Sequence, residues 1–161
     1  MLMTWLRDVS MDWGSYYANH AAIRTVVAFV HVGALMASGG AAVTSDWRLL
    51  SAFRRGDAAR RAELEAIQPV HHVVTGGIVL LTLSGVLLFA ADLDAYLVSR
   101  VFWIKMGLLA LLLVNGSVLW LAERRASRGE AAWPTLRVTA LASLALWFLV
   151  TLGGVALPNI G

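Results

Sequence analysis

The chain has 161 residues, of which 59% are hydrophobic and 14% are charged, and its mean hydropathy is +0.72. Soluble domains carry about 25% charged residues, so this composition excludes an ordinary soluble domain and indicates an integral membrane protein. The formal net charge is +3, but the cations lie between apolar runs rather than in one tail, so we expect no nucleic-acid partner. The lack of cysteine excludes disulfides and cysteine-ligated iron–sulfur clusters.

Residues 1–20 combine apolar side chains at three- and four-residue spacing with charged side chains between them. The apolar positions are Leu2, Trp5, Leu6, Val9 and Trp13, and the charged ones are Arg7, Asp8 and Asp12. This pattern predicts a short amphipathic helix that lies in the membrane interface and covers one end of the protein. The segment lacks the basic start and short apolar core of a cleaved signal peptide, so we expect it to be retained.

Four apolar runs follow, at about residues 21–43, 70–91, 101–122 and 138–157. Each has ~20 or more residues and would be ~30 Å or longer as a helix, which matches the thickness of the hydrocarbon core. The runs lack the strict alternation of a membrane β-strand. The sequence therefore predicts an all-α integral membrane protein, a single domain over residues 1–161 whose four transmembrane helices form an up-and-down bundle.

The connection between the first two runs also has helical character. Residues 46–55 are amphipathic and predict that the first helix continues beyond the bilayer. Gly56 and Asp57 break that pattern, and residues 58–67 resume it before Pro69.

The basic residues predict the orientation. Nine of them lie in the first and third connections: Arg48, Arg54, Arg55, Arg60, Arg61, Arg124, Arg125, Arg128 and Arg137. The other four, Arg7, Arg24, Arg100 and Lys105, belong to the opposite side. Because cytoplasmic loops carry an excess of Lys and Arg, we expect a protein of the bacterial inner (plasma) membrane with both termini on the outer, periplasmic side.

Three of the four histidines, His31, His71 and His72, lie within the predicted spans. An ionisable side chain in lipid is costly unless it is paired or faces a cavity, so these residues mark a candidate site. A pair of histidines from facing helices holds a b-type haem in membrane cytochromes. Gly76 and Gly77, one turn beyond His72, would let a porphyrin approach the backbone, although glycines also serve ordinary helix contacts in membranes.

The level of each histidine in the bilayer complicates a haem held within one chain. Counted from the shared cytoplasmic end, His31 lies about twelve residues deep, whereas His71 and His72 lie one or two residues deep. Ten residues of helix correspond to ~15 Å, so a joint clamp needs a shifted helix boundary or a ligand from another chain. His71 and His72 are also ~100° apart around their helix, so at most one faces a given ligand.

Copper is the alternative metal. Met36 stands near the cytoplasmic end of its helix and could approach His71 or His72, and a His and Met ligand set suits Cu(I). Asn115, in the middle of the third span, predicts an interhelical hydrogen bond.

Several polar landmarks occur in a characteristic order along residues 25–120. They are Asp46-x-Arg48-Leu49-Leu50, Arg54-Arg55, Pro69, the run from Gly85 to Asp92, Tyr96, Phe102-x-x-Lys105 and Asn115. In these features the chain resembles a group of small bacterial four-helix membrane proteins of unknown function, which are in turn similar to the membrane domain of copper-resistance protein D. The resemblance implies a four-helix bundle, but it implies no particular chemical reaction. The adjacent pair His71 and His72 departs from the pattern.

Three functions remain open at this point. The first is a small membrane subunit of an electron-transfer complex that binds b-type haem through His31, His71 and His72. The second is a haem-free accessory subunit of a larger membrane complex, and the third is a copper-handling membrane protein that uses the same histidines with Met36. We expect other membrane subunits or a second copy of the chain as partners, beside the lipid bilayer. The sequence favours an electron-transfer or non-catalytic subunit over a self-contained enzyme, because no base, nucleophile and orienting group converge.

Overall fold

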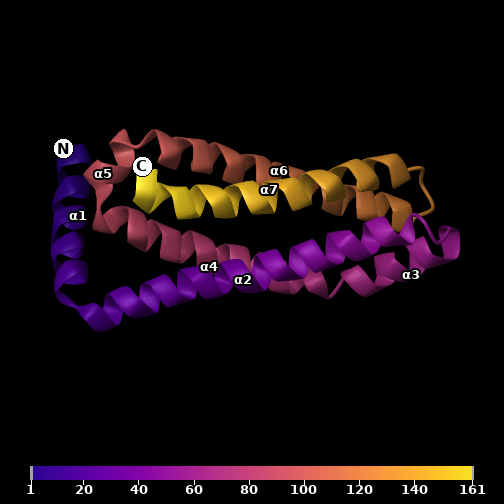
Figure 1. Cartoon of the computed structure of the whole chain (residues 1–161), viewed down its shortest axis with the longest axis horizontal. Coiled ribbons are helices and arrows are strands. Elements are labelled where there is room, and N and C mark those ends of the chain that lie inside the picture. The colour runs from indigo at the N-terminus through magenta and orange to yellow at the C-terminus, as the bar shows by residue number, and fades with distance from the viewer. Residues whose placement is uncertain (1, 161) are drawn as a thin grey trace.

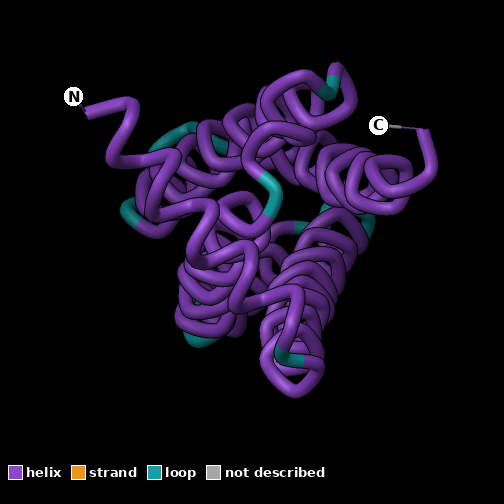
Figure 2. The backbone as a smooth tube through the Cα atoms, turned by 90° about the vertical axis from the view of Figure 1, so that its left-hand side faces the viewer, coloured by secondary structure: helices purple, strands orange, loops and turns teal. Residues whose placement is uncertain are grey.

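The computed structural model describes the backbone of residues 2–160 and the side chains of residues 7–159, and this part of the chain consists of helices joined by short loops, without strands (Figure 2). The helices are α1 (Leu2–Asn19), α2 (Ala21–Ala52), α3 (Asp57–Ile67), α4 (Val70–Ala91), α5 (Leu93–Val98), α6 (Arg100–Ser127) and α7 (Trp133–Ile160). Within this part, α2, α4, α6 and α7 are long and apolar enough to cross a membrane. The prediction of four membrane-spanning helices is therefore confirmed in length and composition.

The long helices lie side by side, and their ends form two distinct regions (Figure 1). At one end lie α1, α5 and the C-terminus, and we call this the terminal end. At the other end lie α3 and the connection from α6 to α7, and we call this the loop end. α2 packs against α4 and α7, and α7 packs against α6.

Helix boundaries at the loop end follow the sequence signals. α2 continues past the first apolar run to Ala52, and α3 begins at Asp57 after Gly56, so the predicted extension of the first helix and the break at Gly56 are both present. Gly56 and Gly129 have φ of 96° and 82°, a region that only glycine adopts without strain. Each therefore marks the place where the chain leaves one helix and turns toward the next.

α1 runs across the terminal end, roughly perpendicular to the long helices (Figure 1). Its side chains donate hydrogen bonds to carbonyls in the last turns of α4: Ser10 Oγ to Ala90 at 2.7 Å and Trp13 Nε1 to Leu87 at 2.8 Å. The last carbonyls of a helix lack partners within that helix. α1 thus provides hydrogen-bond donors to carbonyl oxygens at the end of α4, and these polar contacts attach it to that helix.

The buried core is small and divided into two clusters. One lies at the loop end and includes Leu49, Ile67 and Leu136, and the other surrounds Trp147 in the middle of the long helices. Many large apolar side chains instead point outward, as Phe29 does with 75% of its surface exposed. An apolar exterior over long helices is what lipid contact requires, and it suits a bilayer environment.

Candidate functional site

His71 stands in the first turn of α4 and makes polar contacts through both ring nitrogens. Nε2 lies 2.8 Å from Glu123 Oε2 of α6, and Nδ1 lies 3.2 Å from the carbonyl oxygen of Ile67. A carbonyl oxygen only accepts, so Nδ1 must carry a hydrogen. The contact between Nε2 and the carboxyl group then requires a second proton, carried either by the imidazole or by Glu123. His71 and Glu123 therefore share a proton between two helices.

Asp46 of α2 lies beside this pair and is only 3% exposed. The hydroxyl group of Ser143 on α7 faces the Asp46 carboxyl, and His71 and Glu123 are within electrostatic range. Its Oδ2 atom has no hydrogen-bond partner among the described residues. An ionised carboxylate costs several kcal/mol to bury without a partner. The four residues Asp46, His71, Glu123 and Ser143 form what we call the loop-end polar centre, with one member from each long helix.

α3 packs against α2, α4 and α6 at the loop end. Glu63 of α3 forms an ion pair with Arg48 of α2, with Oε1 and Nε 2.7 Å apart. Leu64 and Ile67 bury their side chains in the adjoining apolar cluster. The connection is thus attached to the loop end by one charged and several apolar contacts.

His31 occupies a separate place nearer the terminal end. Its Nδ1 lies 2.9 Å from Ser84 Oγ, and Ser84 donates its own hydroxyl hydrogen to the carbonyl oxygen of Leu80 at 2.6 Å. Because that hydrogen is already used, Nδ1 must be the donor to Ser84. In the neutral imidazole Nε2 then keeps a free lone pair. The ring also lies against Gly85, and Lys105 of α6 is within electrostatic range.

The predicted site residues do not come together. Ser84, the partner of His31, lies thirteen residues after His71 on α4, which is about 20 Å along the helix. His72 is exposed beside the partly covered His71, as the ~100° separation of the two side chains predicted. Met36 is 73% exposed. Among residues 7–159, no three His, Asp or Glu side chains are grouped so that they could hold a metal ion, and haem or copper ligation stays a prediction.

Sequence reasoning selected His71 but missed its partner. Glu123 lies directly after the third apolar run and is followed by two arginines, and the sequence did not identify it as a site residue. Asp46 was named only as part of the resemblance to small four-helix membrane proteins. A signal was present, because Asp46 and Glu123 lie just beyond the predicted spans 21–43 and 101–122, beside the arginines of the two basic connections.

No protein-family model, curated protein sequence or solved structure matches the chain. The resemblance to small four-helix membrane proteins and to the membrane domain of copper-resistance protein D therefore stays a prediction from sequence features alone.

Proposed function

We propose that this protein is a small membrane subunit whose loop-end polar centre exchanges protons with the adjoining aqueous phase. In the predicted orientation, with both termini on the periplasmic side of a bacterial inner membrane, that phase is the cytoplasm. The proposal includes the up-and-down arrangement of the four spans and the interfacial position of α1. One observation carries it: the contact between His71 and Glu123 requires a shared proton, next to the buried carboxyl of Asp46.

The side chains differ in exposure in a way that suggests a direction of transfer. His71 has a side chain 31% exposed, whereas that of Glu123 is 12% exposed and Asp46 is 3% exposed as a residue. A proton from water would reach the His71 imidazole first and be shared between Nε2 and the Glu123 carboxylate. Asp46 lies within electrostatic range of this pair, and its unpartnered Oδ2 would take up a proton of its own when the buffer is acidified. Protonation relieves the cost of burying negative charge.

Infrared difference spectroscopy of protein reconstituted in liposomes tests this proposal. We expect a carboxylic-acid absorption to appear when the buffer is acidified, and we expect part of it to be lost in Asp46→Asn and in Glu123→Gln. Asp94→Asn is the matched control, because the Asp94 side chain is 81% exposed at the terminal end. If spectra of Asp46→Asn and Glu123→Gln change no more than that of the control, while circular dichroism shows intact helices, the proton-exchange proposal is wrong.

A second candidate function is ligation of a b-type haem in an electron-transfer complex. It is favoured by the hydrogen bonding of His31, which leaves Nε2 with a free lone pair as an axial ligand needs. His71 uses both nitrogens in other contacts, so a second axial ligand would come from another chain. A Soret band in protein co-expressed with its membrane partners, lost in His31→Gln and kept in His72→Gln, is the expected result. Absence of the band with ample haem would eliminate this candidate.

A further inference from the structure

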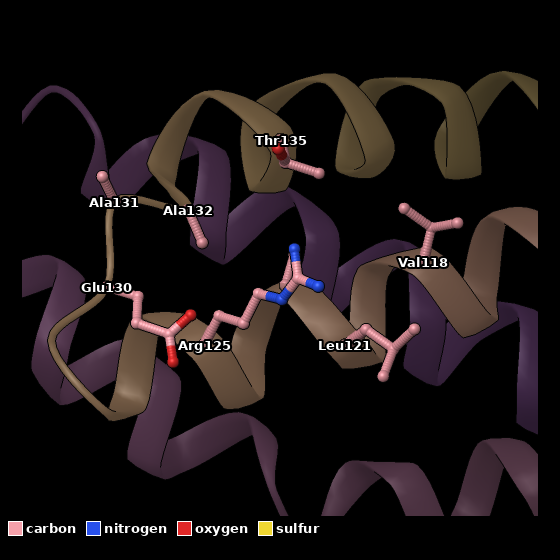
Figure 3. Close-up of a pocket in the computed structure, with 8 residues that line it drawn as sticks. Val118, Leu121, Arg125, Glu130, Ala131, Ala132 and Thr135 are labelled. Carbon is pink, nitrogen blue, oxygen red and sulfur yellow. The ribbon is translucent and has the colours of Figure 1, made fainter.

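A pocket of about 210 Å³ lies between α6 and α7 at the loop end (Figure 3). Its lining combines apolar side chains with two opposite charges. Val118 and Leu121 of α6 form the apolar part, and Arg125 and Glu130 form the charged part (Figure 3). Thr135 in the first turn of α7 contributes a hydroxyl group.

The two charged groups face the same pocket without neutralising each other. No ion pair within 4.0 Å joins Arg125 or Glu130 to another described residue, or one to the other. The backbone brings the two residues close together, because Glu130 N–H donates to the Arg125 carbonyl oxygen at 3.1 Å around the turn at Gly129. A guanidinium and a carboxylate thus line the same exposed pocket, and neither forms an ion pair with a described residue (Figure 3).

The pocket lies at the depth where headgroups meet lipid tails. Arg125 is 25 residues beyond the start of α6 at Arg100, which is about 38 Å of helix and exceeds the ~30 Å hydrocarbon core. Val118 is about two turns deeper and 40% exposed. A ligand that fits would therefore be polar at one end and apolar at the other, with both charges on the polar end.

We propose that this pocket binds one phospholipid with a primary-amine headgroup. Its phosphate would pair with Arg125 and accept a hydrogen bond from Thr135, its ammonium would donate to Glu130, and one acyl chain would follow Val118 and Leu121. An anionic headgroup without the amine meets repulsion from Glu130. A quaternary amine cannot donate the hydrogen bond that a carboxylate accepts. The charge pattern therefore selects the amine-bearing lipid over both.

Native mass spectrometry of the full chain, released from nanodiscs with equal phosphatidylethanolamine, phosphatidylcholine and phosphatidylglycerol, tests the proposal. We expect preferential retention of one phosphatidylethanolamine. Arg125→Gln should reduce this retention about tenfold, as loss of a charge-assisted hydrogen bond predicts. Glu130→Gln should reduce the preference for phosphatidylethanolamine and raise binding of phosphatidylglycerol. The matched controls Arg128→Gln and Glu65→Gln change charge equally outside the pocket lining and should behave as wild type.

Two results would overturn the proposal. The first is equal retention of all three lipids by the wild-type protein, which needs no variant. The second is displacement of the lipid by free phosphoethanolamine at similar concentration, since this would show that a soluble phosphoamine, without an acyl chain, is the true ligand class.

Discussion

α2 and α4 approach each other closely at Gly77, and an added methyl group there gives a sharp test of the packing. A Cβ on Gly77 would lie 2.5 Å from Cβ of Ser38 and 3.2 Å from the carbonyl oxygen of Ala34. Ordinary contacts between carbon atoms are about 3.5–4.0 Å. Ser38 is fully buried, so Gly77→Ala would force the two helices apart by about 1 Å.

The magnitude follows from two opposing effects. Overpacking of this kind costs about 1–3 kcal/mol, whereas replacing glycine by alanine within a helix returns up to about 1 kcal/mol. We expect Gly77→Ala to lower the free energy of unfolding by about 1–2 kcal/mol. Gly76→Ala is the matched control, because a Cβ there meets nothing within 4 Å, and it should be neutral or slightly stabilising.

Denaturant unfolding of the detergent-purified variants, followed by circular dichroism, measures the difference. Removal of the opposing Cβ by Ser38→Gly in the Gly77→Ala background should recover most of the loss, which a double-mutant cycle reports as a coupling energy. Equal midpoints for Gly77→Ala and Gly76→Ala, or absence of coupling to Ser38, would refute the close approach of these helices.

Two further predictions concern polar groups. Asn115→Leu removes the hydrogen bond from Nδ2 to the carbonyl oxygen of Thr139, which joins α6 to α7 at 3.0 Å. This change should lower the free energy of unfolding by about 0.6–2 kcal/mol in the same denaturant assay. The control Ser117→Ala removes a hydroxyl group that bonds only within α6, and it should lower the free energy of unfolding less. In α5, outside the four long helices, burial and then the nearby Asp92 carboxylate raise the pKa of Tyr96. Asp92→Asn should therefore lower this pKa, so that tyrosinate absorbance appears at lower pH; an unchanged titration would remove Asp92 as a cause.

The main features of the fold could be predicted because hydrophobic length and loop breakers are local properties. The apolar runs located α2, α4, α6 and α7, and Gly56 located the break before α3. The six-residue helix α5 lies in a connection for which the sequence predicts no helix. It is too short for a helical periodicity to appear, and its helix is stabilised at the terminal end by long-range contacts, such as the ring of Tyr96 at 5.5 Å from that of Phe102.

The partners of the histidines could not be predicted in the same way. A uniformly apolar run does not encode how its helix is rotated toward its neighbours. The sequence could state that His71 and His72 face different directions, but not that His71 would meet Glu123. The sequence predicts an interhelical hydrogen bond for Asn115 without identifying its partner, and in the structure the partner is the carbonyl oxygen of Thr139. Local sequence thus specifies which groups need partners, and only the packing specifies which partners they obtain.

The separation of the polar groups limits what the loop-end polar centre can do. Between His72 and Ser84, α4 contains no titratable side chain, and Thr82 is exposed and bonded within its own helix. The buried residues of this middle region are mainly apolar and surround Trp147. About 20 Å of helix therefore separates His71 from His31, far beyond the hydrogen-bond distance that a direct proton transfer needs.

Proton exchange at the loop end should consequently be local rather than transmembrane. Liposomes that contain the protein and an internal pH dye should remain as tight to protons as empty liposomes when valinomycin imposes a potassium diffusion potential. The same preparation should still show the infrared response assigned to Asp46 and Glu123. Rapid, protein-dependent acidification of the liposome interior would contradict this view, because it would require a continuous path through the apolar middle. If the liposomes remain impermeable to protons, the group that receives the proton must lie at the loop end. The long apolar faces leave room for a partner subunit that could provide this group.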